Sequence, residues 1–365
     1  MGIKKFITTF TIIMMVFLVV SGFILITYIN NQEVKAIEKA NSQTNNDVQS
    51  NTDNPSENNF ATSYINYPEA FNFIIFVKDV DGTNTDAMMI VNYDPQNKKI
   101  STLSIPRDIV YKTIYAKDDE GNFIYENGKQ KVIKVKINSL YIPEIFKATE
   151  EAFKDTSLSI DEAKTIGKTE GSKNAVHIFE NFFNVNIKYY VTIDLSIFRE
   201  VIDQLGGVDF YIPANLHYDD PTQDLHIHFN KGTYHLNGEA AEELLRYRKP
   251  NGNEYNAELD AAYPTEGSDL DRINMQQKFF QELIKQKSNF FYVTKISNIL
   301  DSVYTNIQTN IDLNAILDLV KYIPDFDMES ILWETVPGEI SGNDYVVDYN
   351  KTRAMILENF KGSNK

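Results

Sequence analysis

The chain has 365 residues, of which 42% are hydrophobic and 12% aromatic, enough to bury the core of one large domain or two smaller ones. It contains no cysteine, which excludes disulfides and thiolate metal sites. With 35 basic and 51 acidic side chains the formal net charge is −16. This charge argues against a nucleic-acid partner, because nucleic-acid binders carry a basic face.

A segment without charged side chains, residues 6–29, follows Lys4 and Lys5 near the N-terminus. As a helix it would extend about 36 Å at ~1.5 Å per residue, which crosses a bilayer with some tilt. The positive-inside rule then predicts a cytoplasmic tail at 1–5, a single transmembrane signal-anchor helix in the cell membrane, and an extracellular remainder. The alternative is a cleaved signal peptide, but the apolar run is longer than a usual h-region and no small-x-small site follows it.

Residues 30–66 are predicted to form a flexible extracellular tether. Their central part, 41–59, is rich in Asn, Ser and Asp and cannot bury enough apolar surface to order itself. As a flexible coil the tether would span about 30–36 Å. A globular domain at 67–365 would therefore stand off the membrane but stay near it.

Three apolar segments open that domain, at 73–77, 87–93 and 100–105, and each predicts a buried strand. Asp79 and Asp86 flank the polar loop between the first two. Two carboxylates on one loop suit Mg²⁺, which takes one or two carboxylates and completes its shell with water and phosphate oxygen. On spacing alone, an ordinary acidic loop is the simpler interpretation.

The sequence Ser104-Ile105-Pro106-Arg107-Asp108 ends the third strand, because proline removes a ladder donor and disfavours helix at the residue before it. Arg107 and Asp108 are therefore expected just beyond a strand end, where open α/β sheets hold their ligands. The chain has only six arginines, so lysine is its usual cation. An arginine here indicates a need for the planar fork that grips phosphate or carboxylate, and an ordinary surface ion pair is the competing interpretation.

The rest of the domain alternates between predicted strands and helices. Residues 111–135 predict a β-hairpin, residues 147–171 a helix followed by a loop, and Asp194 is a good N-cap for the helix that follows it. The other predicted elements are helices at 174–183, 238–245, 293–300, 313–322 and 349–360 and strands at 189–193 and 208–212. This alternation predicts an α/β fold, a layered α-β-α domain around a mixed central sheet.

Two residue pairs in the second half of the chain could bind ions. His226 and His228 could be a metal pair on one strand face, but no cysteine is near and a surface strand is the favoured interpretation. Arg246 and Arg248 would point to one side of an extended chain, where two like charges need an anion between them. Arg272 is expected in the first turn of a helix capped by Ser268, where the helix N-terminus already attracts anions.

Taken together, the motifs resemble the LytR-CpsA-Psr family of cell-envelope ligases, from about Phe71 to the C-terminal helix. Any one motif is weak, but their order and joint presence are specific. The matching pieces are the Asp79–Asp86 loop, SIPRD at 104–108, KIN at 136–138, GGVDFYIP at 206–213, LNGEAAEELLRYR at 236–248, DLDRINMQQ at 269–277 and VPG at 336–338.

The resemblance implies transfer of a phosphorylated anionic glycopolymer, of teichoic-acid or capsule type, from a polyprenyl-pyrophosphate carrier to peptidoglycan. It implies Mg²⁺ held by Asp79 and Asp86. The residues implied to hold the pyrophosphate are Arg107, Lys136, Arg246, Arg248 and Arg272. The residues implied to be catalytic are Arg107, Asp108 and Asp269.

This chain departs from the family pattern at three places. Asn84-Thr85 stands where the family usually has Arg-Ser, Met275 where it often has Arg, and Val77-Lys78 where it usually has Gly-Ser. Two phosphate-facing cations are therefore expected to be absent, and Lys78 is a candidate to replace one. Two alternative functions follow. One is a non-catalytic, membrane-tethered regulator that binds polyprenyl phosphate or wall polymer, and the other is a polyprenyl-pyrophosphate hydrolase.

Overall fold

The computed structural model describes residues 69–78, 84–118, 120–221, 225–252, 256–287, 307–312, 315 and 330–362. The predicted anchor, the tether and the loop residue Asp79 lie outside the described residues, as do the predicted helix at 293–300 and nearly all of that at 313–322. Among the helices that are described, none has both the length and the apolar character needed to cross a membrane.

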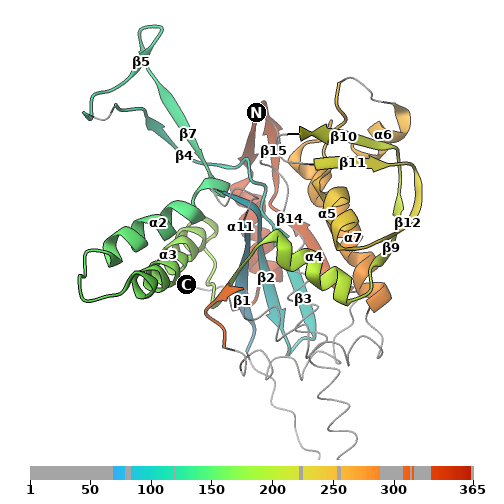
Figure 1. The fold of residues 1–365 in the computed structure, drawn as a ribbon, viewed down its shortest axis with the longest axis horizontal. Helices are drawn as coiled ribbons and strands as arrows, with labels where there is room; N and C mark the ends of the chain where they lie inside the picture. Colours follow the sequence, from blue (N-terminus) through green and yellow to red (C-terminus); the bar gives the residue numbers. More distant parts are fainter. Residues whose placement is uncertain are drawn as a thin grey trace, which may run out of the picture.

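The described part of the chain is built on a six-stranded mixed sheet with the order β13-β8-β1-β2-β3-β14 (Figure 1). Antiparallel pairing joins β1 to β2, β2 to β3 and β13 to β8, whereas β8 runs parallel to β1 and β14 runs parallel to β3. The mixed central sheet predicted from the sequence is thus confirmed. The strands are β1 (Phe71–Lys78), β2 (Thr85–Asp94), β3 (Lys99–Ser104), β8 (Tyr189–Ile193), β13 (Gln308–Thr309) and β14 (Leu332–Thr335).

This topology brings several strand ends to one edge of the sheet. The last residues of β1 pair with the first residues of β2, with Val77 opposite Ala87. Ser104 at the end of β3 lies beside both Met89 of β2 and Thr335 at the end of β14. The segments after β1, β3, β8 and β14 therefore leave the sheet together, which is where ligands bind in open α/β sheets.

Helices cover both faces of the sheet. The strands are apolar on both faces. Ile75 and Met89 point into one buried cluster, and their neighbours Ile74 and Met88 point into the other. The first cluster includes residues of α4 (Leu195–Gln204), α5 (Gly238–Arg246) and α7 (Asp269–Lys287). The second includes residues of α2 (Tyr141–Ala152), α3 (Ile160–Phe183) and α11 (Tyr349–Asn359). Figure 1 shows α5 and α7 to the right of the sheet, α4 crossing in front of it, and α2 and α3 to its left.

The α2–α3 hairpin corrects one prediction. The sequence predicted a loop before residue 174, but α3 runs unbroken from Ile160 to Phe183. Gly167 and Gly171 lie inside the helix because α2 approaches closely: a Cβ on Gly171 would stand 2.5 Å from Ile145 Cα. These two glycines are the contact points of the two helices.

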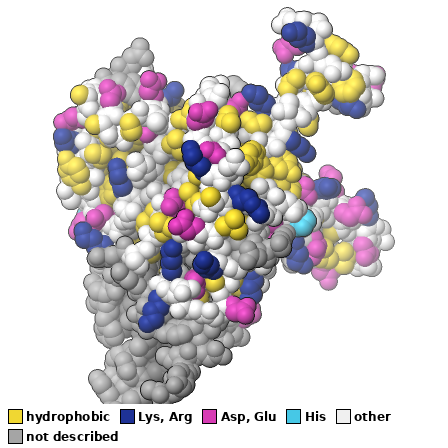
Figure 2. All heavy atoms as spheres, turned by 180° about the vertical axis from the view of Figure 1, so that it is seen from behind, with side chains coloured by type: hydrophobic (Ala, Val, Ile, Leu, Met, Phe, Trp, Pro, Cys, Tyr) yellow, Lys and Arg dark blue, Asp and Glu magenta, His cyan; other side chains and the backbone are white. Residues whose placement is uncertain are grey.

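The predicted hairpin at 111–135 is present as an arm that projects from the body (Figure 1). It is formed by β4 (Val110–Tyr115) and β7 (Val132–Lys136), with β5 (Tyr125–Glu126) and β6 (Lys129–Gln130) at its tip. Asn127 and Gly128 turn the tip with positive φ angles of 52° and 75°, as a tight β-turn requires. Figure 2 shows its hydrophobic side chains exposed at the upper right.

The remaining described elements are short. Six of them are strands that form three antiparallel pairs, β9 with β12, β10 with β11, and β15 with β16. Their bounds are β9 (Val208–Ile212), β10 (Leu216–Asp220), β11 (Leu225–Phe229), β12 (Gly232–Leu236), β15 (Gly338–Ser341) and β16 (Asp344–Val347). The others are the 3-10 helix η1 (Ile137–Ser139) and the helix α6 (Ala257–Ala262).

Candidate active site

Two arginines predicted from distant motifs meet on one carboxylate. Asp269, the first residue of α7, accepts a 2.9 Å hydrogen bond from the backbone N–H of Arg107 through its Oδ2. Its Oδ1 lies 3.5 Å from Nε of Arg107 and contacts Nη2 of Arg272. Arg107 is fully buried and Arg272 is 1% exposed. The loop after β3 and the first turn of α7 therefore join through a buried cluster with two positive charges and one negative charge.

A cleft of about 340 Å³ opens beside this cluster. Three predicted residues line it: Asp108 from the loop after β3, Arg248 from the segment after α5, and Asp269. The turn between β15 and β16 also lines it, with Asn343 and Asp344. Polar groups from four separate chain segments thus surround one cavity.

Lys136 stands at the junction of the arm and this cleft. Its Nζ lies 2.6 Å from Oδ1 of Asp108 and 3.8 Å from Oδ1 of Asp344, and it donates to the carbonyl of Asn343. The backbone N–H of Tyr345 donates to the Asp108 carbonyl at 2.8 Å. The predicted lysine and the predicted aspartate are therefore brought together with a hairpin turn that was not predicted to belong to the site.

Arg246 and Arg248 differ in their surroundings. Arg246 ends α5 and is buried, with Nη1 3.1 Å from Oε1 of Glu242, one turn earlier. The chain becomes extended at Tyr247, and Nε of Arg248 donates to the Gly267 carbonyl at 3.1 Å. Arg248 lines the cleft, whereas Arg246 lies behind it with a carboxylate already in contact.

Tyr218 of β10 lies near enough to interact electrostatically with both arginines and with Asp220 of the same strand, which was not predicted. Burial and the neighbouring Asp220 carboxylate raise the pKa of the Tyr218 hydroxyl, while Arg246 and Arg248 act in the opposite direction. Asp220 is itself buried. The inner face of β10 therefore brings an acidic and a phenolic group to the arginine pair.

The predicted magnesium ligands are only partly described. Asp79 follows β1 directly in sequence and lies outside the described residues. Asp86 is the second residue of β2. The next residue, Ala87, pairs with Val77 of β1, so Asp86 lies at the sheet edge that carries the arginine cluster. Thr85 joins this edge to the KIN segment, because its Oγ1 donates to the Asn138 carbonyl at 3.0 Å.

Lys78, the candidate replacement cation, ends β1 at the same edge. Its Nζ lies 2.8 Å from Oδ1 of Asp194. Asp194 occupies the position before α4, as predicted, but its side chain makes no capping hydrogen bond. The predicted N-cap position of Asp194 is confirmed, while its carboxylate contacts the lysine at the end of the neighbouring strand in place of a capping hydrogen bond.

The residues missed by sequence reasoning share a cause. Asn343 and Asp344 follow Gly342, whose φ of 62° suits a tight turn, and this triplet could have predicted a hairpin. Nothing local, however, relates that turn to Lys136, which lies 207 residues before Asn343. Tyr218 was missed for the same reason, since its arginine contacts come from another element.

Comparison with known proteins agrees with this architecture. The LytR_cpsA_psr family model matches residues 26–363. The chain is 28% identical over 269 residues to the polyisoprenyl-teichoic acid–peptidoglycan teichoic acid transferase TagV of Bacillus subtilis (strain 168), covering 73% of this chain and 54% of that protein. It is 29% identical over 247 residues to the corresponding transferase TagU of Bacillus anthracis (strain CDC 684 / NRRL 3495), covering 67% of this chain and 61% of that protein.

The chain thus spans between half and two thirds of the length of these curated relatives. The crystal structure of B. subtilis TagV superposes with a TM-score of 0.50 at 24% identity, covering 80% of this chain and 97% of that one, which shows a shared fold. Because the family match extends over nearly the whole chain, this protein belongs to the LytR-CpsA-Psr family.

Proposed function

We propose that this protein transfers a phosphorylated anionic glycopolymer, of teichoic-acid or capsule type, from a polyprenyl-pyrophosphate carrier to peptidoglycan. Two relatives carry the name of polyisoprenyl-teichoic acid–peptidoglycan teichoic acid transferase, which supports the donor and acceptor classes. The proposal includes a single membrane anchor at residues 6–29, which would keep the domain within reach of a lipid-linked donor.

One observation carries the proposal. Arg107 and Arg272 are buried beside Asp269, and Asp269 lines a cleft that Arg248 also lines. Asp108 and Asp344 line the same cleft, so its fit to a phosphate rests on the guanidinium fork, which grips two phosphate oxygens at once. Guanidinium groups held beside the cleft suit a pyrophosphate, whose negative charge grows on the leaving phosphate as the transferred phosphorus changes partner.

In this reaction an acceptor hydroxyl attacks the phosphorus next to the sugar, the bond to the bridging oxygen breaks, and polyprenyl phosphate leaves. Arg248 would bind the phosphate oxygens from the cleft, while Arg107 and Arg272 would stabilise negative charge from the buried side. Lys136 and Asp108 form a pair 2.6 Å apart, and Asp108 lines the cleft, where it can accept the hydroxyl proton.

Mg²⁺ belongs to the proposal as well. The carboxylates of Asp79 and Asp86 are hard oxygen donors of the kind that Mg²⁺ takes, and the backbone position of Asp86 at the shared sheet edge supports a site near the cleft. When bound, the ion would act as a Lewis acid on phosphate oxygen and orient the pyrophosphate.

The test is a transfer assay with the full-length chain in detergent, a polyprenyl-pyrophosphate-linked saccharide, Mg²⁺ and peptidoglycan fragments. Arg248→Lys keeps the charge but removes the two-pronged fork, so turnover should fall about 10²–10³-fold, by analogy with loss of one preorganised oxyanion donor. Arg353→Lys, at an exposed position of α11, is the matched control and should retain wild-type turnover.

The products separate the proposal from its alternatives. A transferase yields saccharide joined to the acceptor through phosphate, and only when acceptor is present. Release of phosphorylated saccharide without acceptor would instead identify a hydrolase. Retention of the lipid donor without any turnover would identify a binding regulator and contradict the proposal.

A further inference from the structure

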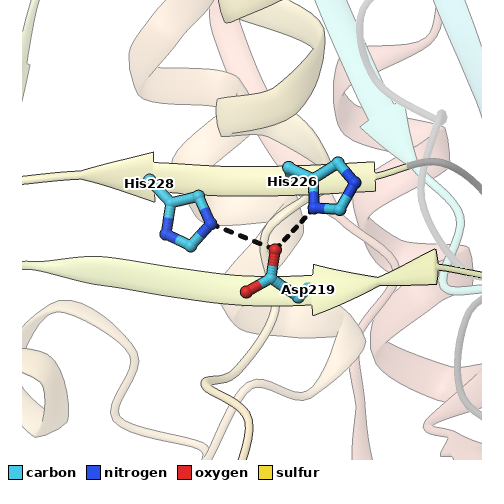
Figure 3. A group of neighbouring side chains, drawn as sticks. All are labelled: Asp219, His226 and His228. Atoms are coloured by element: carbon cyan, nitrogen blue, oxygen red, sulfur yellow. Dashed lines mark hydrogen bonds and ion pairs between the residues drawn. The ribbon is translucent and has the colours of Figure 1, made fainter.

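The outer face of the β10–β11 hairpin gathers three histidines and one aspartate. Pairing in this hairpin sets His217 opposite His228 and Asp219 opposite His226. Residues two apart on a strand share a face, so all four side chains lie on the same side of the two strands. Figure 3 shows Asp219, His226 and His228 pointing toward one another from the two strands. The surface strand predicted at His226 and His228 is confirmed, and it carries more than the sequence indicated.

The donor atoms of three of these residues are already close. Oδ1 of Asp219 lies 2.6 Å from Nδ1 of His226 and 3.0 Å from Nε2 of His228, and one ligand atom from each residue falls within 4.8 Å of the others. Two donors bound at 2.0–2.1 Å to a tetrahedral ion stand about 3.3 Å apart. To hold an ion, the Asp219–His226 separation would need to open by about 0.7 Å and the Asp219–His228 separation by about 0.3 Å.

His217 provides the support that a histidine ligand usually needs. Its Nδ1 lies 3.4 Å from Nδ1 of His228, the ring nitrogen that faces away from Asp219. When His228 donates its Nδ1–H to His217, its Nε2 carries the lone pair and points at the carboxylate. Metal-binding histidines typically have their second ring nitrogen hydrogen-bonded in this way, which fixes the tautomer and the ring orientation.

The surroundings favour a cation with an affinity for imidazole. Asp219 supplies one negative charge, and Glu243 of α5 lies near enough to interact electrostatically with His228. The three donor side chains are about half exposed, so a water molecule can complete the coordination. Two imidazoles and one carboxylate suit Zn²⁺ and its neighbours in the transition series, whereas Mg²⁺ and Ca²⁺ prefer oxygen donors alone.

We propose that Asp219, His226 and His228 bind one divalent transition-metal ion, with His217 as the residue that orients His228. The site is separate from the proposed magnesium ligands and does not depend on the proposed function. Asn251 connects it to the cleft region, because its Nδ2 donates to the Asp219 carbonyl at 3.1 Å and its Oδ1 accepts from the Asp219 N–H. Asn251 lies three residues after Arg248, so an ion that fixes the hairpin also restrains the segment carrying that arginine.

The test is calorimetric titration of the full-length chain in detergent with Zn²⁺, after removal of metals by a chelator. The protein is prepared without a histidine tag, and the buffer contains excess Mg²⁺ to fill any sites made of oxygen donors. Wild type should bind one equivalent of Zn²⁺. His217→Phe should weaken that binding about 10–100-fold, the usual cost of losing an outer partner, and His226→Ala or His228→Ala should weaken it further. Bound Co²⁺ should give the intense visible absorption of a tetrahedral site in wild type but not in a His226→Ala, His228→Ala double variant.

The chain offers a matched control in His235→Ala. His235 is exposed on β12, opposite Asp209 of β9, with Nδ1 2.7 Å from the carboxylate, but this pair has no second histidine beside it. Its loss should leave Zn²⁺ affinity unchanged. The proposal is overturned if wild type binds no Zn²⁺, or if a His226→Ala, His228→Ala double variant binds it as tightly as wild type. Equal binding by the folded double variant would locate the ion elsewhere.

Discussion

Asp269 is the residue on which the candidate site depends most directly. It accepts from the backbone of Arg107 and contacts the guanidinium groups of Arg107 and Arg272, while being only 6% exposed itself. Taking charges out of water is costly, and a buried charge whose partner has been removed costs more than the intact pair contributes. This carboxylate therefore makes it possible to keep two arginines buried beside the cleft.

The first prediction is that Asp269→Ala destabilises the folded protein. Removing the carboxylate leaves two buried guanidinium groups facing each other, so the free energy of unfolding should fall by about 3–5 kcal/mol. Urea unfolding followed by circular dichroism measures this change. As a control, Glu170→Ala removes an exposed carboxylate 2.7 Å from Lys173 and should cost less than about 1 kcal/mol. Equal effects of the two substitutions would contradict the buried cluster.

The second prediction concerns pH. Burial raises the pKa of Tyr141 to about 12, although its hydroxyl is hydrogen-bonded to Ser172 and Thr192. The tyrosine has its ordinary pKa near 10 in the unfolded chain, so its contribution to stability is complete below pH 10 and is lost as the pH rises toward 12. Between pH 9 and 11, wild type should lose about 1 kcal/mol more than Tyr141→Phe in urea unfolding. Parallel losses in both proteins would show that Tyr141 ionises as readily folded as unfolded.

At the scale of elements, the α2–α3 hairpin shows how backbone contact replaces side-chain packing. Gly167 meets Thr149 and Gly171 meets Ile145, so the two helices approach through their backbones. A capping box at Ser159 and Glu162 begins α3 well before the segment that the sequence predicted to be helical. The hairpin is thus held by close approach along one side and by apolar residues of α3 against the sheet.

The third prediction is that Gly171→Ala destabilises the protein even though alanine favours helix. The new Cβ would stand 2.5 Å from Ile145 Cα and 2.6 Å from the Glu144 carbonyl oxygen, so backbone must move. The free energy of unfolding should fall by about 1–3 kcal/mol, measured by urea unfolding. Thr165→Ala, at an exposed position of the same helix, should change it by less than about 0.5 kcal/mol. A stabilised Gly171→Ala protein would show that the helices do not touch there.

The elements that could be predicted from the sequence are those whose own residues specify them. The strands at 73–77 and 87–93 were recognisable as continuous apolar runs, and Pro106 correctly marked the end of β3. The errors came from residues whose role depends on a partner element. The loop predicted up to Gly171 is helix because α2 approaches closely there, and the Asp194 carboxylate contacts Lys78 of another strand in place of a capping hydrogen bond. Neither partner can be recognised from the local sequence.

At the scale of the whole molecule, the site is an assembly of segments far apart in the sequence. Arg107 and Asp269 meet across 162 residues, and Asn343 meets Lys136 across 207. The sequence selected Arg107, Arg246, Arg248 and Arg272 as candidates through their motifs and local positions, with the scarcity of arginine as support. It could not show that Arg248 lines the cleft while Arg246 lies on Glu242, because that difference arises from how the helix end packs.

The sheet order also constrains when the molecule can fold. β14 is the parallel neighbour of β3, and the side chain of Asn92 on β2 donates to the Lys361 carbonyl at 2.8 Å. A Cβ on Gly362 would stand 2.5 Å from the Ala70 carbonyl oxygen, so the last described residues touch the first strand. During synthesis β3 must therefore wait for a partner strand that is made about 230 residues later. The hydrophobic edge of β3 stays open for that interval, and completion of the sheet is expected to be a late step in which chaperones can compete.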